Sequence, residues 1–108
     1  MGQLDEEGAR ASVDVSVDGS GSPVLALSGE IDISNVASIE TEVETVLARS
    51  PERLVFDLSQ LDFIDSSGIA MLLRAGERSA RVEIRKPSST VQRVIRATGL
   101  DDVLHVQP

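Results

Sequence analysis

The twenty residues from 54 to 73 constrain the fold more than any other part of the chain. Leu54 to Leu58 is a nearly uninterrupted apolar run, which is typical of a short strand buried on both faces. A polar turn and the apolar pair Phe63-Ile64 follow, and Asp65-Ser66-Ser67-Gly68 then precedes apolar residues at helical spacing. This pattern predicts a buried strand that leads through a surface turn into a helix beginning at the two serines.

The start of this predicted helix has the properties of an anion-binding site. The first backbone N–H groups of a helix have no partner within the helix, and the helix dipole adds partial positive charge there. A phosphate group attached to Ser66 or Ser67 would therefore meet a suitable environment. Simple N-capping by a serine explains the same residues. The residues alone leave both interpretations open.

The flanking sequence predicts alternating strands and helices. Apolar residues alternate with polar ones over 13–17, as in a half-exposed strand. Before residue 54 the sequence predicts a turn over 18–23, a strand over 24–28, a loop over 29–34 and a helix with Ser34 as N-cap that ends at Ser50-Pro51. After the strand and helix described above, it predicts a strand over 82–84 and a helix capped by Ser88 or Ser89, with Gly99 after its end. A last strand or irregular segment follows over 103–106. The order ββαβαβαβ predicts an α/β domain with a mixed, mostly parallel sheet of four to five strands and right-handed crossovers.

Composition limits the function. A net charge of −8 argues against binding to nucleic acid or to an anionic membrane surface. The absence of cysteine excludes disulfides and thiolate chemistry. No apolar run approaches the ~20 residues of a membrane span, and residues 1–11 lack the apolar core of a signal peptide. We expect a cytoplasmic protein in which residues 1–10 form a flexible tail.

The hypothesis of a serine hydrolase finds little support. A serine hydrolase needs a Gly-x-Ser-x-Gly turn, but Ile64 or Asp65 occupies the first glycine position. The single histidine, His105, is near the chain end in an apolar segment, so a catalytic triad is poorly supported.

Acidic residues have a simpler explanation than metal binding. The carboxylates with the right chemistry for magnesium are Glu30, Asp32, Asp62 and Asp65. Turn and capping roles explain them, and we expect no cofactor. A second acidic set, Glu40, Glu42 and Glu44, is expected on a solvated helix face.

Four segments, taken together, resemble the STAS domain. They are Gly29-Glu30-Ile31-Asp32, Val55-Phe56-Asp57-Leu58-Ser59, Phe63-Ile64-Asp65-Ser66-Ser67-Gly68-Ile69 and Thr98-Gly99-Leu100. Within this family the chain is most similar to the bacterial anti-sigma-factor antagonists, also called anti-anti-sigma factors. The similarity extends from about Val13 to Val106 in matching order and spacing. It implies a single STAS domain over residues 11–108, with strands and helices in a βα superhelix, and a protein that is not an enzyme.

The resemblance also implies a phosphorylation switch. The unphosphorylated protein would bind an anti-sigma factor that is also a serine kinase of the GHKL ATPase type, and the sigma factor would be released. The kinase would then phosphorylate the first serine of Asp-Ser-Ser-Gly, which is Ser66, and a PP2C-type phosphatase would reverse the modification. The implied partner-binding residues are Glu30, Asp32, Ser34, Asp65, Ser66, Ser67 and Gly68.

One alternative within the family stays open. The chain would then be a STAS domain that is never phosphorylated, acting as a scaffold or as an accessory subunit of a lipid-transport ATPase. An intact acceptor serine beside Asp65 favours the switch.

Overall fold

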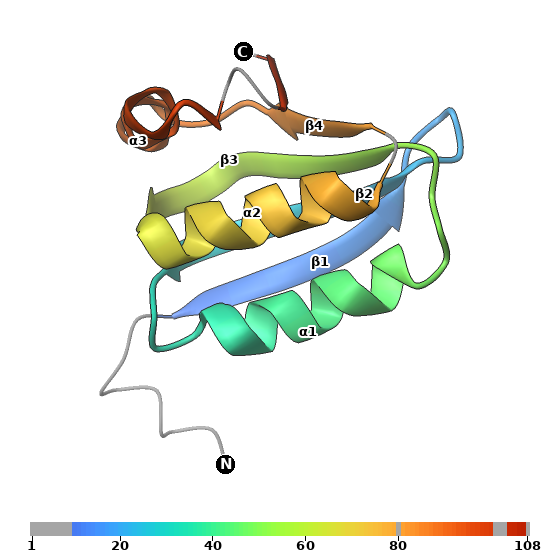
Figure 1. The fold of residues 1–108 in the computed structure, drawn as a ribbon, viewed down its shortest axis with the longest axis horizontal. Helices are drawn as coiled ribbons and strands as arrows, with labels where there is room; N and C mark the ends of the chain where they lie inside the picture. The colour runs from blue at the N-terminus through green and yellow to red at the C-terminus, as the bar shows by residue number, and fades with distance from the viewer. Residues whose placement is uncertain (1–9, 80, 101–103, 108) are drawn as a thin grey trace.

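The computed structural model describes residues 10–79, 81–100 and 104–107. Most of the expected tail, and Val103 of the last expected strand, lie outside these residues. The elements are β1 (Ala11–Val17), β2 (Pro23–Ile31), α1 (Val36–Leu47), β3 (Leu54–Ile64), α2 (Ser66–Arg78), β4 (Val82–Arg85), α3 (Ser89–Thr98) and β5 (His105–Gln107) (Figure 1). The predicted order ββαβαβαβ is confirmed.

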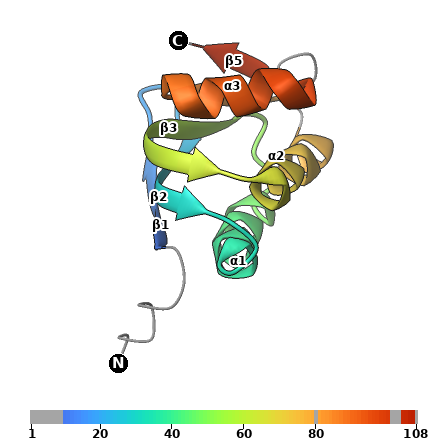
Figure 2. The same cartoon turned by 90° about the vertical axis from the view of Figure 1, so that its left-hand side faces the viewer.

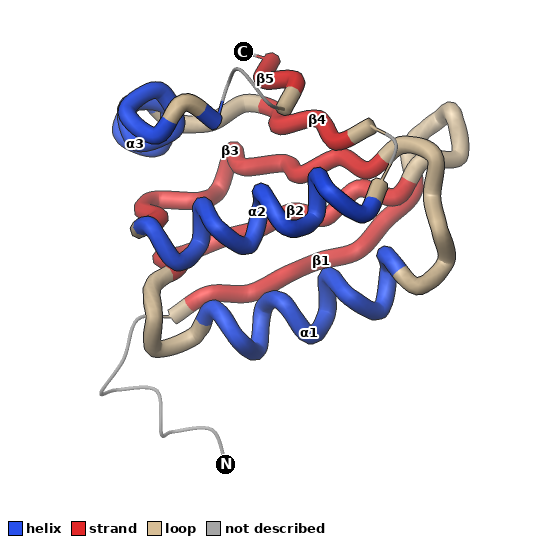
Figure 3. Tube along the Cα trace, in the orientation of Figure 1, coloured by secondary structure: helices blue, strands red, loops and turns tan. Residues whose placement is uncertain are grey.

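The strands form one five-stranded sheet in the order β1-β2-β3-β4-β5. β1 pairs antiparallel with β2, and every later neighbour pairs in parallel. α1 and α2 lie side by side on one side of the sheet (Figure 2). Because β2, β3 and β4 run in parallel, the loops that follow them lie at one end of the sheet, where all three helices begin (Figure 3). We call this end the carboxyl edge and the opposite end the amino edge.

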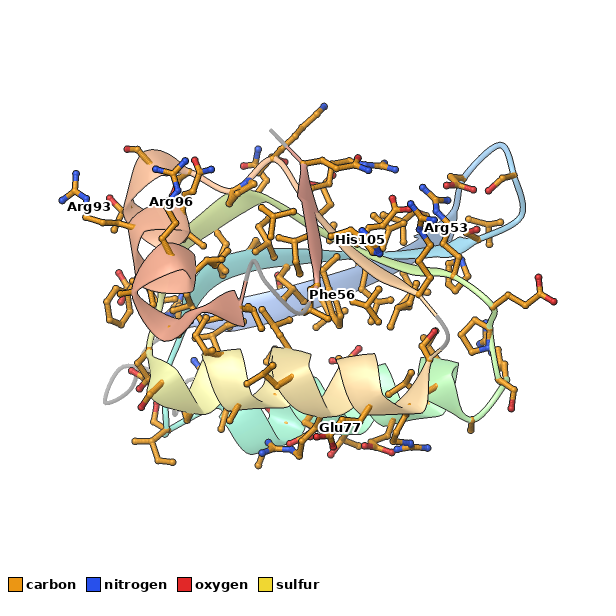
Figure 4. The ribbon with its side chains drawn as sticks, turned by 45° about the horizontal axis from the view of Figure 1, so that its top comes forward. Arg53, Phe56, Glu77, Arg93, Arg96 and His105 are labelled. Atoms are coloured by element: carbon orange, nitrogen blue, oxygen red, sulfur yellow. The ribbon has the colours of Figure 1, made fainter. Side chains whose placement is uncertain are left out.

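The core lies between the sheet and the helices. The predicted apolar face of α1 is confirmed, since the helix residues Val36, Ile39, Val43, Val46 and Leu47 are buried. Leu25 and Phe56 are register partners on β2 and β3, and both are fully buried. Figure 4 shows Phe56 between the sheet and α2, whereas Arg93 and Arg96 of α3 point away from the core.

β3 is longer than predicted. The polar turn expected after Leu58 is strand, which continues to Ile64. The register of β3 against β2 shifts twice, between Ala26 and Ser28 and between Gly29 and Glu30. Each shift changes which side chains face the core, so Leu58, Leu61 and Ile64 are buried at a spacing of three residues. This spacing hid the second half of the strand from a search for alternation.

β2 is also longer than predicted, because it includes Gly29, Glu30 and Ile31. Gly29 has a φ of +88°, and a Cβ atom there would lie 2.1 Å from the backbone oxygen of Arg10. Only glycine fits both conditions, and it lets the chain entering β1 approach β2 closely. The expected loop is therefore reduced to the residues that follow Ile31.

The N-cap of α1 is Asn35, not Ser34 as predicted. The Asn35 side chain accepts a hydrogen bond from the backbone N–H of Asp32 at 3.1 Å and donates one to the carbonyl of Glu30 at 2.8 Å. Ser34 instead donates its hydroxyl to the carboxylate of Asp32 at 2.5 Å. The asparagine thus closes the loop onto the end of β2.

Glu42 is exposed on α1, as expected for a solvated face, whereas Glu40 and Glu44 are half-buried and pair with arginines of α2. Glu40 forms a bidentate ion pair with Arg74 of α2, with N–O distances of 2.7 and 2.8 Å. Glu44 pairs with Arg78 one turn further along. These pairs join α1 to α2 along their exposed seam, where each contributes little to stability.

Candidate functional site

The candidate site lies at the carboxyl edge, where β2 and β3 end together. Their last residues, Ile31 and Ile64, are register partners. The backbone N–H of Asp65 also donates to the carbonyl of Ile31 at 3.1 Å. The loop after β2 and the turn after β3 are therefore fixed next to each other.

Asp65 organises the turn after β3. It is the N-cap of α2, and its Oδ1 accepts hydrogen bonds from the backbone N–H of Ser67 at 2.9 Å and of Gly68 at 3.2 Å. The hydroxyl of Ser67 donates to the same oxygen at 2.5 Å. This hydroxyl, followed by the backbone N–H groups of Gly68, Ser67 and Ile33, holds the pKa of Asp65 below its ordinary value. Asp65 is therefore a charged cap that touches both loops.

These contacts correct the two expectations about the helix start. Asp65, not a serine, caps the helix. The backbone N–H groups of Ser67 and Gly68 were expected to be free for an added phosphate, but both already bind Asp65. A phosphate at Ser66 would thus meet an occupied, negatively charged cap.

The two serines differ in availability. Ser66 is the first residue of α2 and is exposed, and its hydroxyl has no hydrogen bond to any of the described residues. Ser67 is half-buried, and its hydroxyl is bound to Asp65. Of the pair, Ser66 presents the accessible hydroxyl.

Gly68 lies in the first turn of α2 and is buried. A Cβ atom there would lie 2.5 Å from Cγ1 of Ile64 and 3.0 Å from Cγ2 of Ile31. Glycine lets the first turn of the helix lie directly on the ends of β2 and β3. Gly68 therefore positions Ser66 at the start of the helix.

We expect Gly68→Ala to lower the free energy of unfolding by about 1–3 kcal/mol, because a methyl group must displace packed isoleucine side chains. Urea unfolding of both proteins measures the difference. Gly19→Ala is the matched control, since nothing lies within 4 Å of a Cβ atom at Gly19. Equal effects of the two substitutions would show that the helix start is not closely packed.

The loop after β2 repeats the geometry of the turn after β3. Oδ1 of Asp32 accepts from the backbone N–H of Ser34 at 2.9 Å and from its hydroxyl at 2.5 Å, as Oδ1 of Asp65 does from Ser67. In this correspondence Ile33 occupies the place of Ser66. The Ile33 side chain is 77% exposed.

Two surface residues of this edge were not singled out from the sequence. Ile33 was overlooked although it stands between polar residues and outside the apolar face of α1. Phe63 is 41% exposed and is the register partner of Glu30. Phe63 is exposed because the second register shift leaves it one residue before the buried Ile64.

All seven residues expected at the partner surface lie at the carboxyl edge. Glu30, Ser34 and Ser66 are exposed, Asp32, Asp65 and Ser67 are half-buried, and Gly68 is buried. The polar side chains among them form an acidic surface, on which the hydroxyl of Ser66 has no hydrogen bond to the described residues.

His105 lies far from these serines. It is the register partner of Glu83, which is aligned with Val55 near the start of β3, whereas Ser66 follows the end of that strand. At ~3.3 Å per residue, ~30 Å of strand separates them. Figure 4 places His105 near Arg53, away from the start of α2. The histidine cannot act as the base of a triad with Ser66 or Ser67.

Two further features, a metal site and a membrane-spanning helix, can be checked in the described residues. Within the described ranges, no three acidic or histidine side chains are grouped so that they could hold a metal ion. The helices in this part of the chain are too short or too polar to cross a membrane.

Comparison with known proteins agrees with the geometry. The family model described as "Mlab, STAS domain" matches residues 15–106. The anti-sigma-F factor antagonist RsfB of Mycobacterium tuberculosis is 35% identical over 94 residues, which are 83% of this chain and 77% of RsfB.

Solved structures share the fold. The crystal structure of an anti-sigma factor antagonist from Mycobacterium paratuberculosis has a TM-score of 0.85 and 30% identity, covering 92% of this chain and 86% of the other. Bacillus SpoIIAA in its phosphorylated form has a TM-score of 0.66 and 22% identity, covering 88% and 90%.

Proposed function

Since this chain belongs to the STAS domain family, in the group of bacterial anti-sigma-factor antagonists, we propose that it binds an anti-sigma factor through its carboxyl edge. Binding would occupy the anti-sigma factor and release the sigma factor. The similarity to RsfB, named for antagonism of an anti-sigma factor, supports this role. The proposed location is the cytoplasm, where these partners act.

We further propose that phosphorylation of Ser66 ends this association. The partner would be an anti-sigma factor with serine-kinase activity of the GHKL type, and a PP2C-type phosphatase would restore the unmodified form. The observation that carries the proposal is the exposed, unbonded hydroxyl of Ser66 at the first position of α2. SpoIIAA, which has the same fold, exists in a phosphorylated form.

Electrostatics explains how one phosphate would act. A phosphoserine adds about −1.5 to −2 charges at pH 7. The new charge would lie beside the ionised Asp65, and Glu30 near the end of β2 and Asp32 in the loop that follows are adjacent. A partner surface fitted to a neutral hydroxyl would then face like-charge repulsion and the desolvation of a phosphate. Because Ser66 is exposed, the phosphate itself stays in water and the fold is retained.

We expect the purified protein to gain a single phosphate when it is incubated with Mg-ATP and the anti-sigma factor that binds it. Every anti-sigma factor of the genome that encodes this chain would be tested, with intact mass as the readout. Ser66→Ala should gain no phosphate. Ser67→Ala should still be modified, because its hydroxyl serves the cap.

Two results would contradict the proposal. Phosphorylation of the Ser66→Ala variant would show that another residue is the phosphate acceptor. Tight binding to an anti-sigma factor without any phosphate transfer would favour a STAS domain that is never phosphorylated.

A further inference from the structure

The carboxyl edge exposes two large apolar side chains beside Ser66. Ile33 and Phe63 are 77% and 41% exposed. Among the described residues, the other large apolar side chains with such exposure are Val15 and Val17 of β1. Val17 pairs with Pro23 at the start of β2, so it lies at the amino edge. The apolar exposure at the carboxyl edge is thus a separate feature.

Ile33 is held in a fixed position. Asp32 binds the backbone and hydroxyl of Ser34 on one side of it, and Asn35 binds the backbone of Asp32 and Glu30. A side chain presented by an ordered loop loses little conformational entropy on binding, which favours its use as a contact residue.

Asp65 joins the two turns that carry Ile33 and Ser66. Its backbone N–H donates to the carbonyl of Ile31, two residues before Ile33, and its carboxylate accepts from the backbone of Ser67 and Gly68. Ile33 and Ser66 occupy equivalent places in the two matched turns, at the ends of register-paired strands. A protein that covers the Ser66 hydroxyl therefore also meets the Ile33 side chain.

The charge around Ile33 identifies the chemistry of the partner. Glu30 and Asp62 are exposed and Asp32 and Asp65 half-exposed at this edge. An anionic membrane would be repelled by these side chains, whereas a protein pocket with lysine or arginine at its rim would complement them.

We infer that Ile33 is the apolar anchor of the interface, inserted into an apolar pocket of the anti-sigma factor that is rimmed by basic side chains. The inference rests on the proposed function. It separates two tasks at one edge: Ile33 supplies binding affinity in both states, and Ser66 decides whether binding is allowed. Phe63 lies next to Glu30 on the same edge and extends the apolar contact.

The test is calorimetric titration of each variant against the anti-sigma factor that binds the unsubstituted protein. Ile33→Ala should weaken binding about tenfold to hundredfold, and Ile33→Leu should stay within about threefold. Val17→Ala is the matched control, because Val17 is 64% exposed but lies at the amino edge, and its affinity should stay within about twofold.

Salt dependence distinguishes an anchor from a charge contact. The loss in Ile33→Ala should be the same at low and high salt, whereas Glu30→Gln should reduce the salt dependence of the affinity. Unchanged urea midpoints confirm that the variants are folded.

If no anti-sigma factor of the genome binds the unsubstituted protein, the proposed function fails and the inference fails with it. If binding occurs and folded Ile33→Ala binds as tightly as the unsubstituted protein, only the inference is overturned.

Discussion

Replacing Ser66 with aspartate is expected to weaken binding to the anti-sigma factor by about two orders of magnitude relative to Ser66→Ala. The alanine variant removes only an exposed hydroxyl without a hydrogen bond to the described residues, so it should bind as tightly as the unmodified protein and do so constitutively. The aspartate variant places a second carboxylate beside Asp65 at an edge that already carries Glu30 and Asp32. A hundredfold increase in the dissociation constant corresponds to a loss of ~3 kcal/mol of binding free energy.

Titration of both variants with the purified anti-sigma factor measures this difference. Ser16→Asp is the control, because it adds the same charge at an exposed position on β1 whose register partner is Val24, near the start of β2. Similar dissociation constants for Ser66→Asp and Ser66→Ala would remove the basis for an electrostatic switch.

Glu83→Gln is expected to lower the free energy of unfolding by about 2–3 kcal/mol at neutral pH. Glu83 is 3% exposed on β4 and accepts two hydrogen bonds from Arg53, each at 2.8 Å, and one from Arg81 at 2.9 Å. Arg53 also pairs with Asp18 in the turn between β1 and β2, at 2.8 Å. An amide would remove the charge that Arg53 and Arg81 share, leaving Arg53 its pair with Asp18, and would loosen the amino edge.

The same contacts make this contribution dependent on pH. Hydrogen bonds from Arg53, and then those from Arg81, lower the pKa of Glu83 from its ordinary 4.5 to about 2 in the folded protein. Because the folded pKa is the lower one, the stabilisation is complete above about pH 4.5 and is lost as the pH falls towards 2.

Urea unfolding at pH 7 and pH 3 measures both effects. The difference between Glu83→Gln and the unsubstituted protein should be smaller at pH 3. Glu42→Gln, at an exposed position of α1, is the control and should change little at either pH. A constant difference across this range would mean that the Glu83 charge does not stabilise the fold.

The sequence predicted helices and strands well where their ends depend on neighbouring residues. The last helix illustrates this: the Ser88 hydroxyl accepts a hydrogen bond from the backbone of Val91 at 3.2 Å, and Gly99 has a φ of +76°. Both follow from residue types that suit helix ends. The parallel pairing of β2 to β5 also followed from the alternation of strands and helices.

Features that depend on contacts between distant segments were not predictable in this way. The register shifts of β3 arise from its pairing with β2 and break the two-residue period that identifies a strand. The pairing of Glu40 with Arg74 depends on how α1 and α2 pack.

The candidate site was predicted as a set of polar residues, but its arrangement was not. The position of Ser66 at the start of α2 followed from the sequence. The capping role of Asp65 and the exposure of Ile33 depend on the neighbouring ends of β2 and β3. A sequence with several Asp-x-Ser turns gives no indication of which of them lie side by side.

The most direct test compares the unmodified protein with the protein phosphorylated stoichiometrically at Ser66, in binding and in stability. We expect the phosphorylated form to bind the anti-sigma factor a few hundredfold more weakly, which corresponds to 3–4 kcal/mol, while its free energy of unfolding changes by less than about 1 kcal/mol. Equal affinities of the two forms, or a loss of binding that accompanies unfolding of the phosphorylated protein, would contradict a local switch on an intact fold.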